Sequence, residues 1–203
     1  MSQTTREQLL MQAQTLFSQR GFYGVSIAAV AEALGLSKQA LLHHFGSKEK
    51  LYGEVLLGVS DEIESLVNEI ASQQTTVESK FHAVLEALLK HSFSKPEQTT
   101  LLMRELLDNK RRADSARSWY LKRFLKRLTA LLGQSNNWQQ ATESELLAGV
   151  YMLLGSFNYA LVSAPTLQAI YGKSAHKRFE SLIIEQHKTL VDAVLLRPEA
   201  ANR

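Results

Sequence analysis

The sequence predicts an all-α protein in two parts, an N-terminal three-helix domain over residues 1–52 and a larger helical domain over residues 53–203. Apolar residues recur every three or four positions along most of the chain, as they do on one face of a helix. The 203 residues include only three prolines and ten glycines, which favours helices over turn-rich architectures. Hydrophobic residues make up 45% and charged residues 21%, so the chain can bury an ordinary core.

The stretch 26–45 carries the most informative pattern. Its apolar residues fall at helical spacing in two short runs, Ile27, Val30, Ala31 and Leu34, then Leu41 and Phe45. Ser26 and Ser37 precede these runs and are suited to cap a helix N-terminus, while Gly35 can take the left-handed conformation that ends a helix. Two short helices joined by a glycine turn form a helix-turn-helix, the unit that sets its second helix in the major groove of DNA.

The other elements follow in order. Thr4 and Glu7 have capping-box spacing before a first helix that ends at Gly21. A long helix over about 47–71 starts after Gly46 and continues from the first part into the second. Further helices are expected at about 77–93, 96–108, 115–133, 143–163 and 175–195. Residues 136–137 and 164–175 are interpreted as loops or irregular turns.

Residues 5–52 resemble the DNA-binding domain of the TetR family of bacterial transcriptional regulators. The matching segments are LFSQRGFYGVS, IAAVAEALGLSKQALLHHF and GSKEKLY, in that order. The resemblance implies a dimer that binds a palindromic operator, acts as a repressor and is released when a small molecule binds the C-terminal domain. One position departs from the family pattern, because Leu42 stands where the family often has a tyrosine that reaches a phosphate.

We expect the DNA contacts to come from the second helix of the motif and its flanks. Gln39 can bind adenine at two points, Leu42 can touch a thymine methyl, and His43 can contact a base or a phosphate. Lys48 lies in the first turn of the next helix, where a phosphate is favoured. The full candidate set is Ser26, Ser37, Lys38, Gln39, Leu42, His43, His44 and Lys48. The alternative is an ordinary solvated helix face, since residues 1–52 hold five Lys/Arg against three Asp/Glu.

The second part has candidates for an effector pocket and a homodimer interface. The effector, expected to be largely apolar, would contact Phe81, Leu85, Met103, Leu107, Tyr120, Phe124, Tyr151, Leu154, Phe157 and Asn158, although aromatic residues at helical spacing are more often core. The interface candidates are Gly149, Met152, Ser156, Ala160, Phe179, Ile183, Leu190 and Val194, unless the last two helices are only central helices of one bundle. The basic residues Lys122, Arg123, Lys126 and Arg127 line one face of a predicted helix. Such a face is usually just solvated, and the alternatives are an acidic ligand at a pocket mouth or a second contact to nucleic acid.

Several classes of protein are not favoured. The chain has no cysteine, no HExxH or GxSxG motif and no phosphate-binding glycine loop, so we expect no enzyme, metal site or cofactor. The polar N-terminus does not resemble a signal peptide, and no long apolar run indicates a membrane span, so a cytoplasmic protein is expected. The alternative function is a helical protein–protein adaptor that uses the helix-turn-helix for packing. An enzyme within a helical dimer is a third, weaker hypothesis.

Overall fold

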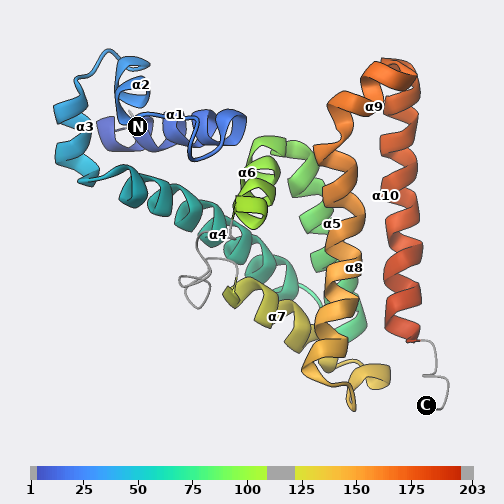
Figure 1. The fold of residues 1–203 in the computed structure, drawn as a ribbon. Helices are drawn as coiled ribbons and strands as arrows, with labels where there is room; N and C mark the ends of the chain where they lie inside the picture. Colours follow the sequence, from blue (N-terminus) through green and yellow to red (C-terminus); the bar gives the residue numbers. More distant parts are fainter. Residues whose placement is uncertain (1–3, 109–121, 198–203) are drawn as a thin grey trace. The chain divides into compact units, whose positions relative to one another are not determined.

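The computed structural model describes residues 4–108 and 122–197, and within these ranges the regular structure is helical throughout (Figure 1). The prediction of an all-α fold is confirmed. The helices are α1 (Thr5–Arg20), α2 (Ile27–Glu32), α3 (Lys38–Phe45), α4 (Lys48–Ser72), α5 (Val77–Ser94), α6 (Pro96–Asp108), α7 (Lys122–Gly133), α8 (Glu143–Val162), α9 (Ala164–Tyr171) and α10 (Lys173–Leu196), with a short 3-10 helix η3 at Asn136–Trp138.

The chain divides into two compact units. The first unit comprises residues 1–62 and 95–120, and the second comprises residues 63–94 and 121–203. Helix α4 contributes its N-terminal part to the first unit and its C-terminal part to the second. The domain boundary between residues 52 and 53 stays a prediction, because the two units are defined by how compactly the chain packs and not by which part binds DNA.

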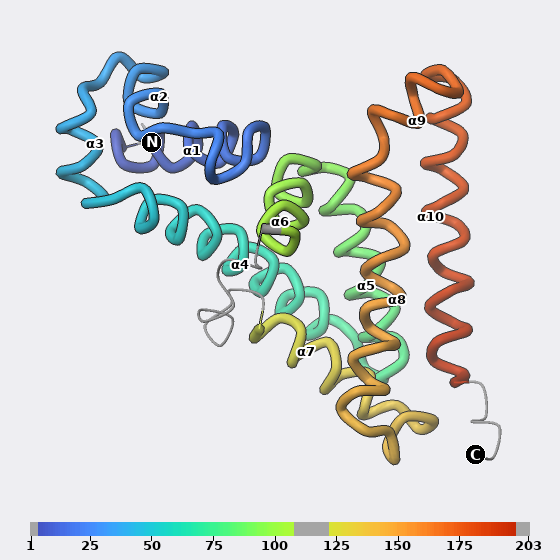
Figure 2. The backbone as a smooth tube through the Cα atoms, in the orientation of Figure 1, coloured from blue at the N-terminus to red at the C-terminus, as the bar shows by residue number. Residues whose placement is uncertain are grey.

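The first unit is built on an aromatic cluster. The rings of Phe17 and Tyr52 meet edge to face at 4.8 Å, and Phe22 lies 5.0 Å from Tyr52. The buried Tyr52 hydroxyl donates a hydrogen bond of 2.9 Å to the carboxylate of Glu105 on α6, which is also buried. Helix α6 also packs along α1, where Arg104 donates to the carbonyl oxygen of Gln19 at 3.2 Å. The three N-terminal helices, visible at the blue end of Figure 2, are therefore held by both α4 and α6.

In the second unit, α5, α7, α8 and α10 pack against one another around a core of large apolar side chains. Phe81, Leu128, Leu153 and Phe157 are among its buried members. Helix α8 is, by length and composition alone, apolar enough to cross a membrane, with a mean hydropathy of 1.4. Because one of its faces is packed against α7 and α10, this apolar character is explained in part by the core.

The prediction of a loop over residues 164–175 is wrong, because residues 164–171 form helix α9. Pro165 lies in the first turn of this helix, where its fixed φ fits and its missing N–H costs no hydrogen bond. Gly172 then ends α9 with a φ of 80°, and α10 begins at the next residue. The proline and glycine thus mark the two ends of a short helix.

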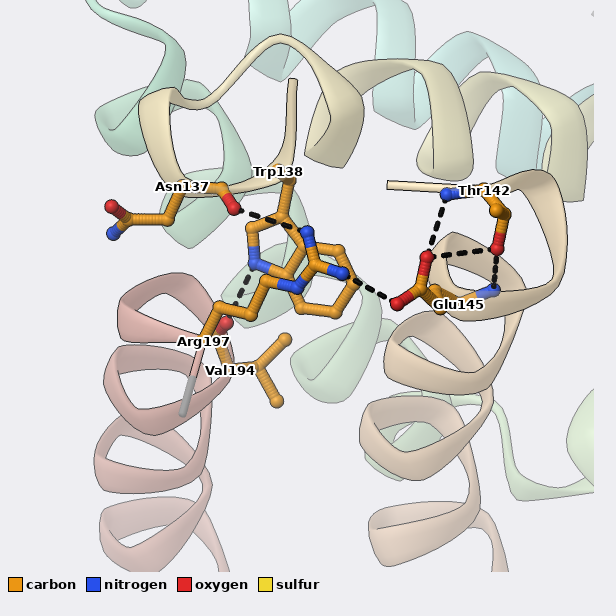
Figure 3. A network of polar contacts seen from close by, with 6 residues as sticks. All are labelled: Asn137, Trp138, Thr142, Glu145, Val194 and Arg197. Carbon is orange, nitrogen blue, oxygen red and sulfur yellow. Dashed lines mark hydrogen bonds and ion pairs between the residues drawn. The ribbon is translucent and has the colours of Figure 1, made fainter. Parts of the chain in front are cut away.

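A network of polar contacts fixes the C-terminal end of α10 against η3 and the start of α8 (Figure 3). The indole N–H of Trp138 donates to the carbonyl oxygen of Val194 at 2.8 Å. The guanidinium of Arg197 lies over the Trp138 ring, 4.9 Å from its centre, and forms an ion pair of 2.5 Å with Glu145. Helices α8 and α10 are therefore held together at this end by stacking and charge as well as by apolar packing.

Candidate nucleic-acid interface

The helix-turn-helix is formed as the sequence predicts. The side-chain hydroxyl of Ser26 accepts the backbone N–H of Ala29, and that of Ser37 accepts the N–H of Ala40, each at 3.1 Å. Between these two N-caps, the backbone closes a Schellman turn with Gly35 at a φ of 67°. In it, the N–H of Leu36 donates to the carbonyl of Ala31 at 2.9 Å, and the N–H of Gly35 donates to that of Glu32 at 3.0 Å.

Helix α3 presents one apolar face to the core and one polar face to solvent. Leu41 is fully buried and Phe45 is 4% exposed, so these side chains fix the rotation of the helix about its axis. Of the candidate DNA contacts, Leu42 and Lys48 are partly buried. The others are exposed, namely Ser26, Ser37, Lys38, Gln39, His43 and His44. An exposed row containing an amide, two imidazoles and an ammonium is chemically suited to bases and phosphates.

The start of α4 adds positive charge next to this surface. The ammonium of Lys48 lies 4.3 Å from the centre of the Phe22 ring, and burial lowers its pKa from the ordinary value. Lys50, which was not singled out from the sequence, is exposed and extends back towards Gly46 at the end of α3. Its spacing after Gly46 places it in the first turn of α4, and this position could have identified it as a second candidate for a phosphate contact.

Comparison with known proteins shows which family the helix-turn-helix segment resembles. Residues 9–55 match the sequence profile of the family described as bacterial regulatory proteins, tetR family. The HTH-type transcriptional repressor KstR2 of Rhodococcus jostii is 36% identical over 88 residues, which cover 43% of this chain and 41% of KstR2. The HTH-type transcriptional repressor AcnR of Corynebacterium efficiens is 40% identical over 48 residues, 24% of this chain and 26% of AcnR. The chain therefore aligns with less than half the length of these curated relatives.

The similarity of fold extends further than the similarity of sequence. The structure of the fatty acid degradation regulator FadR from Bacillus halodurans superposes with a TM-score of 0.70 at 14% identity, covering 96% of each chain. Residues 9–55 therefore carry the sequence signature of the tetR family. At this low identity the superposition on FadR shows the fold alone.

The candidate effector-pocket residues are divided between the two units. Phe81, Leu85, Phe124 and Phe157 are buried side chains of the second unit, and Leu154 and Asn158 of α8 are partly buried. Tyr151 is 47% exposed on α8. Met103 and Leu107 lie on α6 in the first unit, where Leu107 is 78% exposed, and Tyr120 lies outside the described residues. The effector pocket stays a prediction.

Two clefts in the second unit are lined by other residues. One, of about 330 Å³, lies between α8 and α10, with Ser156 on one side and six residues of α10 from Ile183 to Ala193 on the other. The second, of about 260 Å³, lies between α9 and α10 beside the buried His176. Neither cleft is lined by a candidate effector-pocket residue.

The candidate dimer residues divide between the core and the surface. Gly149, Ala160 and Val194 are buried inside the second unit, and a Cβ added to Gly149 would stand 3.0 Å from the Trp138 ring. Ser156, Phe179, Ile183 and Leu190 are partly exposed, and Met152 is 60% exposed. Their role in a dimer stays a prediction. Other large apolar side chains, not included among the interface candidates, are exposed on α8 and α10, namely Leu147, Tyr151, Tyr159, Val162, Leu182 and Leu196.

Proposed function

We propose that this chain is a cytoplasmic DNA-binding transcriptional regulator that binds a palindromic operator as a homodimer. In this proposal it represses transcription until a small, largely apolar effector releases it. The observation that carries the proposal is the geometry of α3. Two buried side chains and a capped N-terminus hold this helix so that Gln39 and His43 face solvent. The repressors KstR2 and AcnR, to which part of this chain is similar, support this interpretation.

Within the proposal, each subunit inserts α3 into the major groove. Gln39 reads a base, with adenine as its best two-point partner, while Lys38, Lys48 and Lys50 bind the flanking phosphates. The exposed N-cap serines and His44 add contacts to the backbone. Leu42 contributes an apolar contact to a thymine methyl in place of the hydrogen bond that a tyrosine would make to a phosphate.

Dimerisation follows from the small size of α3, the helix proposed to bind the major groove. Helix α3 has eight residues and reaches only a few base pairs, so two copies on one DNA face give the affinity that a regulator needs. The exposed apolar side chains of α8 and α10 provide a surface for this pairing. An apolar surface of that extent on two neighbouring helices is typical of a site of association.

Effector binding would change DNA affinity through α4, the 25-residue helix that contributes to both units. An effector can release the operator only if it binds the released arrangement more tightly than the DNA-bound one. A compound of this kind would therefore lower operator affinity, and operator DNA would lower affinity for the compound by the same factor.

DNA affinity as a function of salt separates this proposal from the protein–protein adaptor. Each phosphate neutralised by a lysine releases counterions, so the logarithm of the association constant should fall linearly with the logarithm of salt concentration. Lys50→Ala should reduce this slope by about one unit per subunit, because one phosphate contact is lost. A flat salt dependence, or binding unchanged by Lys50→Ala and Gln39→Ala together, would favour the adaptor.

A further inference from the structure

Helix α10 carries an uncharged seam that its own unit leaves at the surface. Residues separated alternately by four and three positions lie on one side of a helix. Helices that pair along their length use this spacing for the residues between them. The seven seam residues are Ala175, Phe179, Leu182, Gln186, Thr189, Ala193 and Leu196. Five of them are exposed and the other two are partly buried. Helix α10 contains seven Lys, Arg, Asp or Glu residues, and none of them lies on the seam.

The α8 side of the same surface is also uncharged. Ser156 of α8 lines the cleft of about 330 Å³ that lies beside the middle of the seam. Met152 and Tyr159, one turn to either side of Ser156, are 60% and 75% exposed. A surface without charge can meet a second copy of itself without bringing like charges together, which argues for the same chain as its occupant.

Behind the cleft, Ser156 and Nδ1 of His187 are hydrogen-bonded to each other, whereas the buried Nε2 of His187 has no partner among the described residues. The Ser156 hydroxyl donates to the carbonyl of Leu153 at 2.7 Å, so its oxygen is left to accept from Nδ1 of His187 at 3.1 Å. His187 is buried, and this burial lowers its pKa below the ordinary value, so the imidazole is uncharged near neutral pH. On the seam itself, the largest polar side chain is that of Gln186.

Gln186 occupies the middle of the seam, with three seam positions on each side. In a parallel pair of helices every seam position meets its own counterpart. In an antiparallel pair centred on the seam, only the middle position does. Gln186 faces itself in both cases. A primary amide has both a donor and an acceptor, so two such side chains can join across a two-fold axis by a pair of hydrogen bonds.

We propose that the α10 seam pairs with a second copy of this chain and that Gln186 hydrogen-bonds to its own counterpart at the centre, which fixes the register of the dimer. An amide at one position of a largely apolar helix pair can act in this way, because every shifted register leaves the amide buried without its partner. This inference rests on the proposed dimer and adds to it the residue that selects the pairing.

The first test uses the absence of cysteine from the chain. In Gln186→Cys, two thiols would face each other across the axis, within the Cα separation of roughly 4.4–6.8 Å that a disulfide requires. Mild oxidation of the purified full chain should then give a covalent dimer on a non-reducing gel. Ser181→Cys is the matched control, because Ser181 is exposed on α10 but lies off the seam, and it should remain unlinked.

The second test places like charges at the same point. Gln186→Glu keeps the size of the side chain but sets two carboxylates against each other, and it should weaken self-association at least about tenfold. Ser181→Glu adds the same charge to α10 away from the seam and should leave the dimer constant unchanged. Sedimentation equilibrium measures both constants, and circular dichroism confirms that each variant retains its helices.

The outcomes separate this inference from the proposed function. If the wild-type chain is monomeric at concentrations where it occupies an operator, the proposed dimer fails, and the inference fails with it. If the wild type dimerises but Gln186→Cys stays unlinked and Gln186→Glu pairs equally well, the dimer stands and the role of Gln186 is refuted. Linkage through Ser181→Cys in place of Gln186→Cys would show that another face of α10 forms the interface.

Discussion

Gly35 should be the residue of the helix-turn-helix that least tolerates a methyl group, although there is open space around it. Its φ of 67° lies in the left-handed region, and a Cβ built there meets no atom within 4 Å. The cost of Gly35→Ala is therefore conformational, about 1–2 kcal/mol for an L-residue in this region. The smaller entropy of the unfolded alanine chain offsets about 0.4–1 kcal/mol of this, leaving a net destabilisation on the order of 1 kcal/mol.

Gly58 provides a matched control in the same unit. It lies inside α4, and a Cβ added there also meets no atom within 4 Å. Because its backbone is helical, Gly58→Ala should stabilise the protein by about 0.5–1 kcal/mol. The same substitution in equally open surroundings is thus expected to have opposite signs at the two positions.

Urea unfolding of the two variants, followed by circular dichroism at 25 °C, measures the difference directly. The midpoint should move down for Gly35→Ala and up for Gly58→Ala, with little change in the slope of the transition. Gly35→Asn should lie between wild type and Gly35→Ala, because asparagine tolerates the left-handed region better than alanine. If Gly35→Ala stabilised the protein as Gly58→Ala does, the account of the turn would be refuted.

Three further predictions concern the reading helix, the response to pH and the end of α10. Gln39→Ala should weaken operator binding by about 1–3 kcal/mol and relax specificity at one base pair. Equal losses on operator and random DNA would argue against a base contact. Because burial lowers the pKa of His187 in the folded state, the unfolded chain binds this proton more readily. The free energy of unfolding should therefore fall as pH drops below about 6.5, and thermal melts of His187→Gln should show a weaker dependence. Trp138→Phe removes the indole N–H that donates to the Val194 carbonyl, which keeps only the backbone N–H of Arg197, and should cost about 1 kcal/mol in urea unfolding; an unchanged unfolding midpoint would contradict a stabilising role for this bond.

The sequence predicted the helix-turn-helix because its determinants are local. Capping serines act on backbone groups three residues away, and a glycine at the end of an apolar run specifies its own turn. The contacts of Ser26, Ser37 and Gly35 confirm this interpretation. Lys50 lies in the same first turn of α4 as Lys48, so the same local reasoning predicts a phosphate contact for it as well.

Two features of the second unit could not be obtained from local patterns. Helix α8 has a broad apolar stripe that includes Leu147 and Tyr151, and roughly opposite it a stripe of smaller residues that includes Gly149 and Ser156. Periodicity alone does not show which of the two faces its own unit. In the structure, Gly149 of the small stripe packs against Trp138, while Leu147 and Tyr151 of the broad stripe are exposed. The sequence predicts a loop where α9 forms, because Pro165 and Gly172 lie close together there, whereas in the structure they mark the two ends of a short helix.

Selection of bound sequences from a random DNA library, with the purified full chain at about physiological salt, tests the central claim most directly. The account predicts enrichment of one palindrome whose half-sites lie about one helical turn apart or a multiple of it. That enrichment should be lost in a Gln39→Ala/His43→Ala double variant that remains folded and dimeric. A folded wild-type chain that enriches no sequence, or a double variant that enriches the same palindrome, would contradict the claim that α3 reads DNA.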